Sequence, residues 1–261
     1  KASDGSIANL RDVRSGARTF GIVQSDWLAH AVAGTGLFAG VGAGRDLRAV
    51  FGLFREPFTV VARPNAGIAD FVDLKDKRVS FGPEGSGGRA TMGVVMLALG
   101  WTEADFAYVA DLPMADTPRA LCAGEIDAAI FIVAHPNLTV EKMLACGAAM
   151  VPLDAAEIDP LVASNAAYAR VEIPAGAYQR QTSAVPTFGP TATLVTSART
   201  PPAVVRTLVT AVFEGLDVFR AAHPVFHDIE PAQMLGPDLV APLHESVPGA
   251  LAPERADAPF D

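Results

Sequence analysis

The sequence predicts an α/β protein whose helices and mainly parallel strands form two lobes, and three observations lead to this prediction. Short apolar runs alternate with segments of helical period along most of the 261 residues. Turn-forming residues at positions 64–67 interrupt this alternation. Regular periodicity then disappears over residues 151–190 before an apolar strand returns. An inner lobe inserted into a discontinuous outer lobe accounts for both interruptions.

Each predicted element follows from the period of its apolar residues. Continuous apolar runs of about four to eight residues are typical of strands that are covered on both faces. Such runs span residues 19–24, 58–64, 78–82, 107–111, 127–133 and 192–197. Helical periodicity is found over residues 117–124, 140–147 and 203–219. The interruptions divide the chain into a first part of the outer lobe (1–62), an inner lobe (63–162), and a crossover with the second part of the outer lobe (163–261).

Composition excludes two classes of partner. The formal charge is −9 and no run of Lys or Arg occurs, so the chain cannot neutralise a phosphate backbone and we predict no binding to nucleic acid. No apolar run reaches the roughly 18 residues that span a bilayer. Residues 1–10 contain no hydrophobic stretch of a signal peptide, so we expect a soluble protein, with any export signal already removed.

The cysteines and histidines predict no metal site and no cofactor. Cys122 and Cys146 stand outside any C-x-x-C or Cys/His cluster, which argues against zinc. Two buried helical thiols are the favoured interpretation, and a single disulfide is the alternative that an oxidising compartment would favour. The 5 histidines lack metal-ligand spacing, and neither G-x-S-x-G nor H-E-x-x-H occurs, so we predict a binding protein rather than an enzyme.

The glycine-rich stretch VSFGPEGSGGRATM, residues 79–92, has two functional interpretations. Gly85, Gly87 and Ala90 fit G-x-G-x-x-[G/A], and Asp111 ends the next predicted strand, where an acid that binds ribose would stand. This pattern indicates a dinucleotide-binding α/β enzyme as the alternative function. A nucleotide-hydrolysing P-loop is disfavoured, because the positions that require Lys and Ser or Thr hold Gly88 and Arg89.

The second interpretation of the same stretch is an anion site. Glycines let consecutive N–H groups converge, Ser86 adds a hydroxyl, and the helix that follows adds the positive end of its dipole. Arg89 adds a cation that can meet a carboxylate with two parallel hydrogen bonds. The purely structural alternative is a strand-to-helix turn in which Arg89 faces solvent or pairs with a neighbouring acid.

Several ordered blocks resemble one known family. Residues 74–101, LKDKRVSFGPEGSGGRATMGVVMLALGW, resemble the central signature of the TAXI family of TRAP-transporter solute-binding proteins. Four further blocks are similar to that family in order: residues 5–38, 121–137, 173–197 and 243–250. The resemblance covers residues 6–250. Members usually open with a strand and a loop rich in glycine and tyrosine upstream of the first block, and their usual GSGTR reads GSGGR here, with Gly88 in place of threonine.

The resemblance implies a two-lobed periplasmic-binding-protein fold whose hinged cleft closes over a small organic anion. The implied ligand is an amino acid or another carboxylate, and the implied partner is a TRAP-type membrane permease to which the ligand is delivered. A monomeric, periplasmic protein without cofactor or catalytic residues is expected. The resemblance also implies ligand-binding residues from both lobes. These are Gln24, Ser25, Asp26, Ser86, Gly87, Gly88, Arg89, Ala90, His135, Pro136 and Tyr178, with Asn137 beside them.

Most of these residues also have a structural interpretation. Gln24 and Ser25 could cap the helix that follows, and Ser6 and Asn9 are assigned to capping the first helix. His135 could belong to a turn, and Tyr178 could pack with its hydroxyl bonded to backbone. The acids of GEIDAA, Glu125 and Asp127, are predicted to be structural, because catalytic carboxylates need a facing partner in a cleft.

Overall fold

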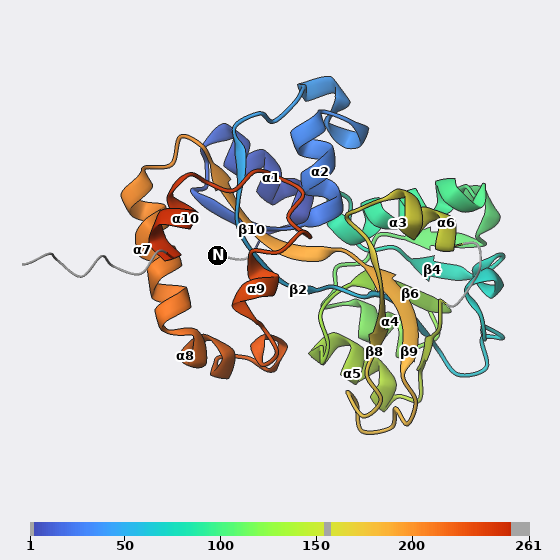
Figure 1. Ribbon diagram of the computed structural model, residues 1–261. Helices are drawn as coiled ribbons and strands as arrows, with labels where there is room; N and C mark the ends of the chain where they lie inside the picture. Colours follow the sequence, from blue (N-terminus) through green and yellow to red (C-terminus); the bar gives the residue numbers. More distant parts are fainter. Residues whose placement is uncertain (1–2, 154–157, 252–261) are drawn as a thin grey trace, which may run out of the picture.

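The computed structural model describes residues 3–153 and 158–251, which form an outer and an inner lobe (Figure 1). The sheet of the outer lobe has the antiparallel strand order β1-β10-β2. Its strands are β1 (Phe20–Gln24), β10 (Thr191–Ser197) and β2 (Leu47–Arg55). Because β10 comes from the second half of the chain and lies between two early strands, the outer lobe is discontinuous in sequence.

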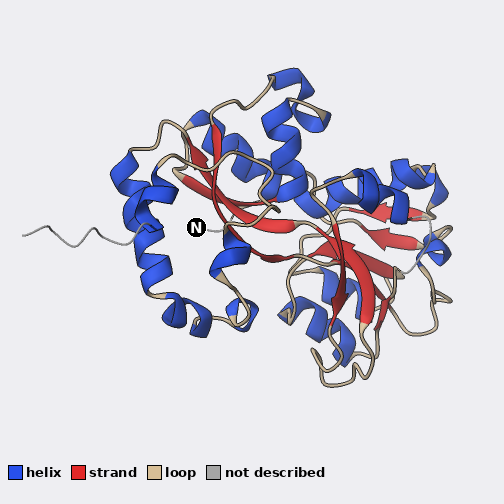
Figure 2. Ribbon diagram, viewed as in Figure 1, coloured by secondary structure: helices blue, strands red, loops and turns tan. Residues whose placement is uncertain are grey.

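Helices cover both faces of the outer sheet (Figure 2). They are α1 (Ser6–Ser15), α2 (Ser25–Ala33), η1 (Gly36–Val41), α7 (Pro202–Glu214), α8 (Leu216–Ala221), η4 (Pro224–Phe226), α9 (Pro231–Met234) and α10 (Ser246–Leu251). One core joins α1 and α2 to one face of the sheet, and a second core joins α7, α9 and α10 to the other. No helix in the described part of the chain is both long and apolar enough to cross a bilayer.

The inner lobe is built on a mixed sheet with the strand order β5-β4-β6-β3-β7. The strands are β3 (Phe58–Ala62), β4 (Arg78–Ser80), β5 (Tyr108–Ala110), β6 (Ala128–Ile132) and β7 (Ala149–Val151). β4 is parallel to β5 and β6, whereas β3 is antiparallel to β6 and β7. The expectation of a mainly parallel sheet is therefore wrong, because β3, which enters from the other lobe, runs against both of its neighbours.

The remaining elements of the inner lobe cover this sheet. They are η2 (Phe71–Leu74), α3 (Gly87–Leu99), η3 (Glu103–Asp105), α4 (Thr117–Cys122), α5 (Leu138–Ala145), α6 (Asp159–Ser164), and the ribbon of β8 (Ala169–Ile173) with β9 (Val185–Gly189). The six apolar runs predicted as strands are all strands. The passage at 151–190, read as irregular, contains the ribbon and lies partly outside the described residues.

Two crossing segments connect the lobes at a different place from the predicted boundaries. The chain enters the inner lobe at Glu56 and Pro57, between β2 and β3, and returns at Gly189 and Pro190, between β9 and β10. The segments are hydrogen-bonded to each other, because the backbone N–H of Glu56 donates to the carbonyl of Pro190 at 2.9 Å. The turn at 64–67 lies within the inner lobe, so the lobes meet after residue 55 and not after residue 62.

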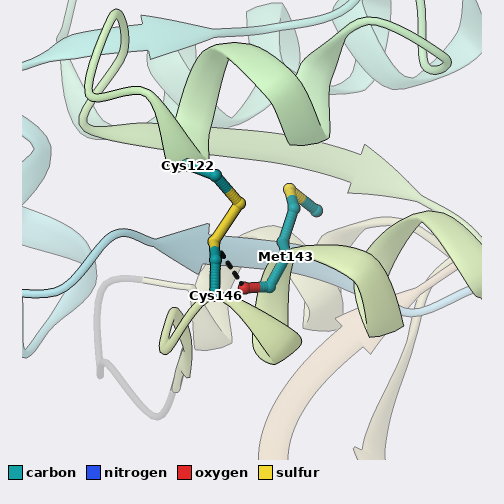
Figure 3. Close-up of a disulfide and its surroundings, with 3 residues drawn as sticks. All are labelled: Cys122, Met143 and Cys146. Atoms are coloured by element: carbon teal, nitrogen blue, oxygen red, sulfur yellow. Dashed lines mark hydrogen bonds between the residues drawn. A yellow bond between two sulfur atoms is a disulfide. The ribbon is translucent and has the colours of Figure 1, made fainter.

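A disulfide joins the two cysteines of the inner lobe (Figure 3). Cys122 ends α4 and Cys146 directly follows α5, and the packing of these helices brings the two Cα atoms to 5.9 Å. The favoured interpretation of two buried thiols is wrong, since both residues are exposed and bonded to each other. The bridge closes a loop across α4, β6 and α5.

The acids of the GEIDAA segment have structural partners. Asp127 accepts hydrogen bonds from Arg78 at 2.8 Å and from Arg63 at 2.7 Å, which ties the ends of β3, β4 and β6 together. These hydrogen bonds hold the pKa of the Asp127 carboxyl well below its ordinary value, and the bonds from the Arg78 side chain contribute most. Glu125 pairs with Arg119 on the surface. Both acids lie away from the interlobe cavity described below.

Candidate functional site

A cavity of about 490 Å³ lies between the two lobes and next to the first crossing segment. Its polar lining includes Ser3, Asp4, Ser6 and Gln24 from the outer lobe, Glu56 from the crossing segment, and Ser86, Gly87 and Gly88 from the inner lobe. Its apolar lining includes Ile22, Phe81, Leu112, Met114, Ile130 and Ile132. Small-molecule pockets occupy about 300–1,000 Å³ and combine apolar walls with a few polar groups, so this cavity fits that description.

The start of α3 forms the polar part of the inner wall. Ser86 caps the helix, because its Oγ accepts a hydrogen bond from the N–H of Arg89 at 3.2 Å. Among the described residues, the N–H groups of Gly87 and Gly88 have no acceptor. The two glycines line the cavity, and the positive end of the helix dipole lies at the same place. A bound anion would supply the acceptors that these amides lack.

The two glycines are packed differently. A Cβ atom on Gly87 would lie 1.5 Å from Oε1 of Gln24 and 3.0 Å from Oγ of Ser6, both from the outer lobe. A Cβ atom on Gly88 would lie 3.5 Å from the backbone nitrogen of Ile132, an ordinary contact. A side chain at position 87 would therefore displace the side-chain amide of Gln24 at the contact between the lobes, whereas position 88 has room for a side chain.

Gln24 contributes to the outer wall of the cavity. Its backbone N–H donates to Oγ of Ser6 at 3.0 Å, and its side-chain amide donates to Oγ1 of Thr91 in the inner lobe at 3.4 Å. The prediction that Ser6 and Asn9 cap the first helix is wrong, because Gly5 is the N-cap of α1 and no side chain caps it. The hydroxyl of Ser6 instead fixes the end of β1 that faces α3. Asn9 stabilises the same strand by donating to the carbonyl of Ile22 at 2.9 Å.

Ser25 and Asp26 lie behind the cavity in the contact between the lobes. Asp26 is fully buried and accepts hydrogen bonds from Oγ1 of Thr91 at 2.8 Å and from the hydroxyl of Tyr168 at 2.9 Å. Burial raises the pKa of the Asp26 carboxyl above its ordinary value, although these hydrogen bonds oppose the rise. Ser25 donates to the carbonyl of Ala167 at 3.0 Å. Neither side chain lines the cavity, so both act by joining the lobes.

Glu56 is a cavity residue that sequence reasoning missed. It is half-buried in the first crossing segment, and its carboxyl group has no hydrogen-bond or ion-pair partner among the described residues. Burial raises the pKa of this carboxyl to about 8, and the negative charge of Asp26 adds to the rise. Its sequence context, FREPF, contains no motif that would have revealed it.

The comparison with protein families agrees with this architecture. Residues 1–251 match the model of the NMT1-like family. The chain belongs to the NMT1-like family.

Solved structures that resemble this NMT1-like chain share its fold. MatC from Rhodopseudomonas palustris, solved with bound malate, is 18% identical with a TM-score of 0.53, over 95% of this chain and 80% of that chain. A protein from Bordetella bronchiseptica RB50 is 17% identical with a TM-score of 0.51, over 95% and 69%. These likenesses show the fold alone, and the predicted two-lobed periplasmic-binding-protein fold is confirmed.

Sulfonate-binding proteins are also similar to the chain. The alkanesulfonate-binding protein SsuA from Xanthomonas axonopodis pv. citri, solved with MOPS, is 15% identical with a TM-score of 0.47, over 92% of this chain and 72% of that chain. The chain spans 62% and 52% of the lengths of two further sulfonate-binding proteins.

Arg89 of the NMT1-like chain lies outside the interlobe cavity. Its guanidinium pairs with the carboxylates of Asp111 and Glu103 and lies 5.8 Å from the ring centre of Phe81. It lines a second groove of about 720 Å³, which also lies between the lobes and shares Phe81 and Ser86 with the first cavity. Ala90 lines the same groove and packs against the core of the outer lobe. Arg89 therefore follows the structural alternative, in which its guanidinium pairs with neighbouring acids. The cavity contains the amides at the start of α3 but not this cation.

His135, Asn137, Tyr178 and Thr59 form a separate hydrogen-bonded group in the inner lobe, here called the His135 cluster. The ring of His135 contacts Oγ1 of Thr59 at 2.8 Å and the hydroxyl of Tyr178 at 2.6 Å, and that hydroxyl accepts from the N–H of Asn137 at 2.8 Å. Burial lowers the pKa of His135 to about 4 and raises that of Tyr178 to about 12.

The His135 cluster does not line the interlobe cavity, and Pro136 beside it is exposed. The structural interpretation of His135 and Tyr178 therefore fits their positions. In the residues that the structure describes, no group of three or more His, Cys, Asp or Glu side chains could hold a metal ion.

Proposed function

We propose that the protein is a periplasmic solute-binding protein that captures a small organic anion between its lobes and delivers it to a membrane permease. One observation carries the proposal: Gly87 and Gly88, whose N–H groups have no acceptor among the described residues, line a cavity shared by both lobes at the start of α3. Membership of the NMT1-like family and the fold shared with MatC support it. MatC itself was solved with malate, an organic anion.

The binding step follows from the positions of these groups. A carboxylate that accepts hydrogen bonds from Gly87 and Gly88 also gains from the helix dipole, and the apolar walls exclude water from the contact. The crossing segments at 56–57 and 189–190 provide the hinge about which the lobes close. A ligand that touches both walls stabilises the closed form by its extra contacts there.

The proposed periplasmic location and the proposed type of permease rest on different observations. The exposed Cys122–Cys146 disulfide supports an oxidising location such as the periplasm. The proposed permease is of the TRAP type, because the blocks around GSGGRA and IVQSD resemble TAXI-family binding proteins. Uptake of radiolabelled ligand into proteoliposomes that contain a TRAP permease would test this partner, and uptake that does not depend on the protein would contradict it.

The dinucleotide-binding alternative receives no support from the site. Asp111, which would have to bind a ribose, is paired with Arg89 and does not line the cavity. A thermal-shift screen over amino acids, dicarboxylates and short-chain acids, with NAD(H) and NADP(H) included, tests the proposed function. We expect stabilisation by at least one carboxylate and no turnover. Stabilisation by dinucleotides alone, or product formation, would contradict it.

A further inference from the structure

The interlobe cavity is lined by a half-buried acid as well as by the amides at the start of α3. Glu56 lines the cavity from the first crossing segment, and Gly87 and Gly88 line it from the inner lobe. Among the described residues of this lining there is no Lys, Arg or His. An anion held by the two amides would therefore share the cavity with a carboxyl group and with no cation.

The titratable groups around Glu56 add negative charge or none. Asp26 of α2 is close enough to act on its carboxyl group electrostatically, and Asp26 is held there by hydrogen bonds from Thr91 and Tyr168. Burial raises the pKa of the Tyr168 hydroxyl, so this hydroxyl carries no charge. Asp4, which precedes α1, lines the same cavity but is exposed, so water screens its charge.

The cations of the neighbouring elements act on other acids. Arg55, next to Glu56 in the chain, is paired with Asp238 at 2.6 Å. Arg89 of α3 is paired with two acids outside the cavity, and His30 acts on the buried acid of its own helix, α2. β6 and the segment after β5 line the cavity with apolar side chains only. No described group near Glu56 therefore favours the ionised form of its carboxyl group.

An anionic ligand and an ionised Glu56 are unfavourable together. When two acidic groups share a site that is partly shielded from water, one of them keeps its proton. The amides of Gly87 and Gly88 and the helix dipole favour the ionised form of the ligand, whereas nothing comparable acts on Glu56. Burial also raises the pKa of Glu56 to about 8, so its carboxyl group is mostly protonated at pH 7 even before a ligand binds.

We infer that Glu56 is a neutral carboxylic acid in the ligand-bound protein, so that the cavity holds an anion together with the proton on Glu56. The amides of Gly87 and Gly88 hold the anionic group, and the protonated carboxyl group of Glu56 supplies a hydrogen-bond donor that an ionised carboxylate lacks. This inference rests on the proposed function and adds a condition to it, because the anion binds well only while Glu56 is protonated.

The protonation of Glu56 determines how ligand affinity depends on pH. With a pKa of about 8, the protonated fraction of Glu56 falls from about nine tenths at pH 7 to about one tenth at pH 9. The affinity for an anion should therefore fall about tenfold over the same range and stay nearly constant below pH 7. Binding should take up nearly one proton at pH 9 and almost none at pH 7. His135, with a pKa of about 4, and the disulfide-bonded cysteines do not titrate in this range.

Isothermal titration calorimetry of the full chain with three anions at pH 7 and pH 9 tests this inference. The probes are succinate, 4-methylpentanoate, and 3-methylbutane-1-sulfonate, in which a sulfonate replaces the carboxylate of the second probe. Titration in two buffers of different ionisation enthalpy gives the number of protons taken up. Every probe that binds at pH 7 should bind about tenfold more weakly at pH 9, with uptake of nearly one proton there. Because the sulfonate stays ionised at both pH values, a proton taken up with it belongs to the protein.

Variants assign the proton to Glu56. Glu56→Gln keeps the shape of the side chain but cannot ionise, so it should bind the tightest probe within about threefold of wild type at pH 7. The variant should show neither the fall in affinity at pH 9 nor the proton uptake. Glu172→Gln, at an exposed site of β8 that does not line the cavity, is the matched control and should behave as wild type does. Circular dichroism and the melting temperature establish that each variant is folded.

Failure of the inference and failure of the proposed function give different results. If wild type binds the tightest probe equally well at pH 7 and pH 9, or more tightly at pH 9, the inference is overturned while the proposed function stands. The same holds if folded Glu56→Gln retains the pH dependence, which would place the proton on another group such as Asp26. If none of the three probes binds at either pH, the inference fails, and a negative thermal-shift screen would overturn the proposed function with it.

Discussion

The interlobe cavity and the His135 cluster contain similar polar groups, but only the cavity groups lack partners. In the His135 cluster, the imidazole of His135 and the hydroxyl of Tyr178 are bonded to each other and to Thr59 and Asn137. In the cavity, the amides of Gly87 and Gly88 and the carboxyl group of Glu56 have no partner among the described residues.

This difference separates a structural polar group from a binding site. A buried polar group without a partner costs about 1–3 kcal/mol, so unpaired groups that converge on a cavity favour a ligand that can satisfy them. A group whose members satisfy each other gains nothing from a ligand. Changes in the cavity should therefore alter ligand affinity, and changes in the His135 cluster should alter only folding stability.

The largest expected effect on ligand affinity comes from a substitution in the cavity wall. Gly87→Ala places a methyl group against the side-chain amide of Gln24, so the lobes must separate or this amide must give up its hydrogen bonds with Ser6 and Thr91. We expect a loss of about 2 kcal/mol in binding the tightest carboxylate ligand, about 30-fold in Kd measured by calorimetry. Gly88→Ala is the matched control and should change Kd less than about threefold. Equal effects of the two substitutions would contradict the proposed packing.

The second expected effect concerns the His135 cluster. Tyr178→Phe removes the hydroxyl that joins His135 to the start of α5 and should lower the free energy of unfolding by about 1–2 kcal/mol. Urea unfolding measures this loss, and Tyr108→Phe at an exposed site is the control. Ligand affinity should stay within about twofold. A large loss of affinity in folded Tyr178→Phe would place this cluster in the binding site.

A smaller effect should follow from the lowered pKa of His135, about 4 in the folded protein against an ordinary value of 6.5. Between these values the unfolded chain binds a proton that the folded protein does not, so stability is lost as the pH falls from 6.5 towards 4. We expect His135→Gln to reduce this loss by about 1 kcal/mol between pH 6.5 and 5, in urea unfolding at both pH values. Identical pH dependence in wild type and variant would contradict the burial of His135, and His227→Gln serves as an exposed control.

The smallest effect is expected at Arg89. Because its guanidinium is paired with Asp111 and Glu103 outside the cavity, Arg89→Ala should change the free energy of ligand binding by less than about 0.5 kcal/mol. Calorimetry with the same ligand as for Gly87→Ala gives the direct comparison. A loss of 2 kcal/mol or more in a folded variant would show that Arg89 leaves its acids and holds the ligand.

Six strands could be predicted because each contains a continuous apolar run, whereas β2 (Leu47–Arg55) and β7 (Ala149–Val151) were missed. β3 and β6, for example, are buried over almost their whole length, which leaves a clear signal in the sequence. The ribbon of β8 and β9 was missed because β8 alternates between partial burial and exposure and β9 contains Pro186. Lobe boundaries were displaced because the crossing at 56–57 contains only one proline and no glycine, whereas the turn at 64–67 contains stronger turn residues.

The candidate site could be predicted only where a local motif positions it. The start of α3 follows from GSGG, and Gln24 from the end of a recognisable strand. The direction of the Arg89 side chain depends on Glu103 and Asp111, and the disulfide depends on how α4 packs against α5. Glu56 becomes a cavity residue only when the crossing segment passes between the lobes. Such contacts arise from tertiary packing, which local sequence patterns do not contain.

The central claim is that the amides of Gly87 and Gly88 hold the carboxylate of a ligand between the lobes. A crystal structure of the protein with the tightest carboxylate ligand from the thermal-shift screen tests it most directly. We predict carboxylate oxygens within about 3 Å of both nitrogen atoms, with the ligand enclosed by walls from both lobes. A ligand bound beside Arg89 in the groove of about 720 Å³, or beside His135 and Tyr178, would contradict the account.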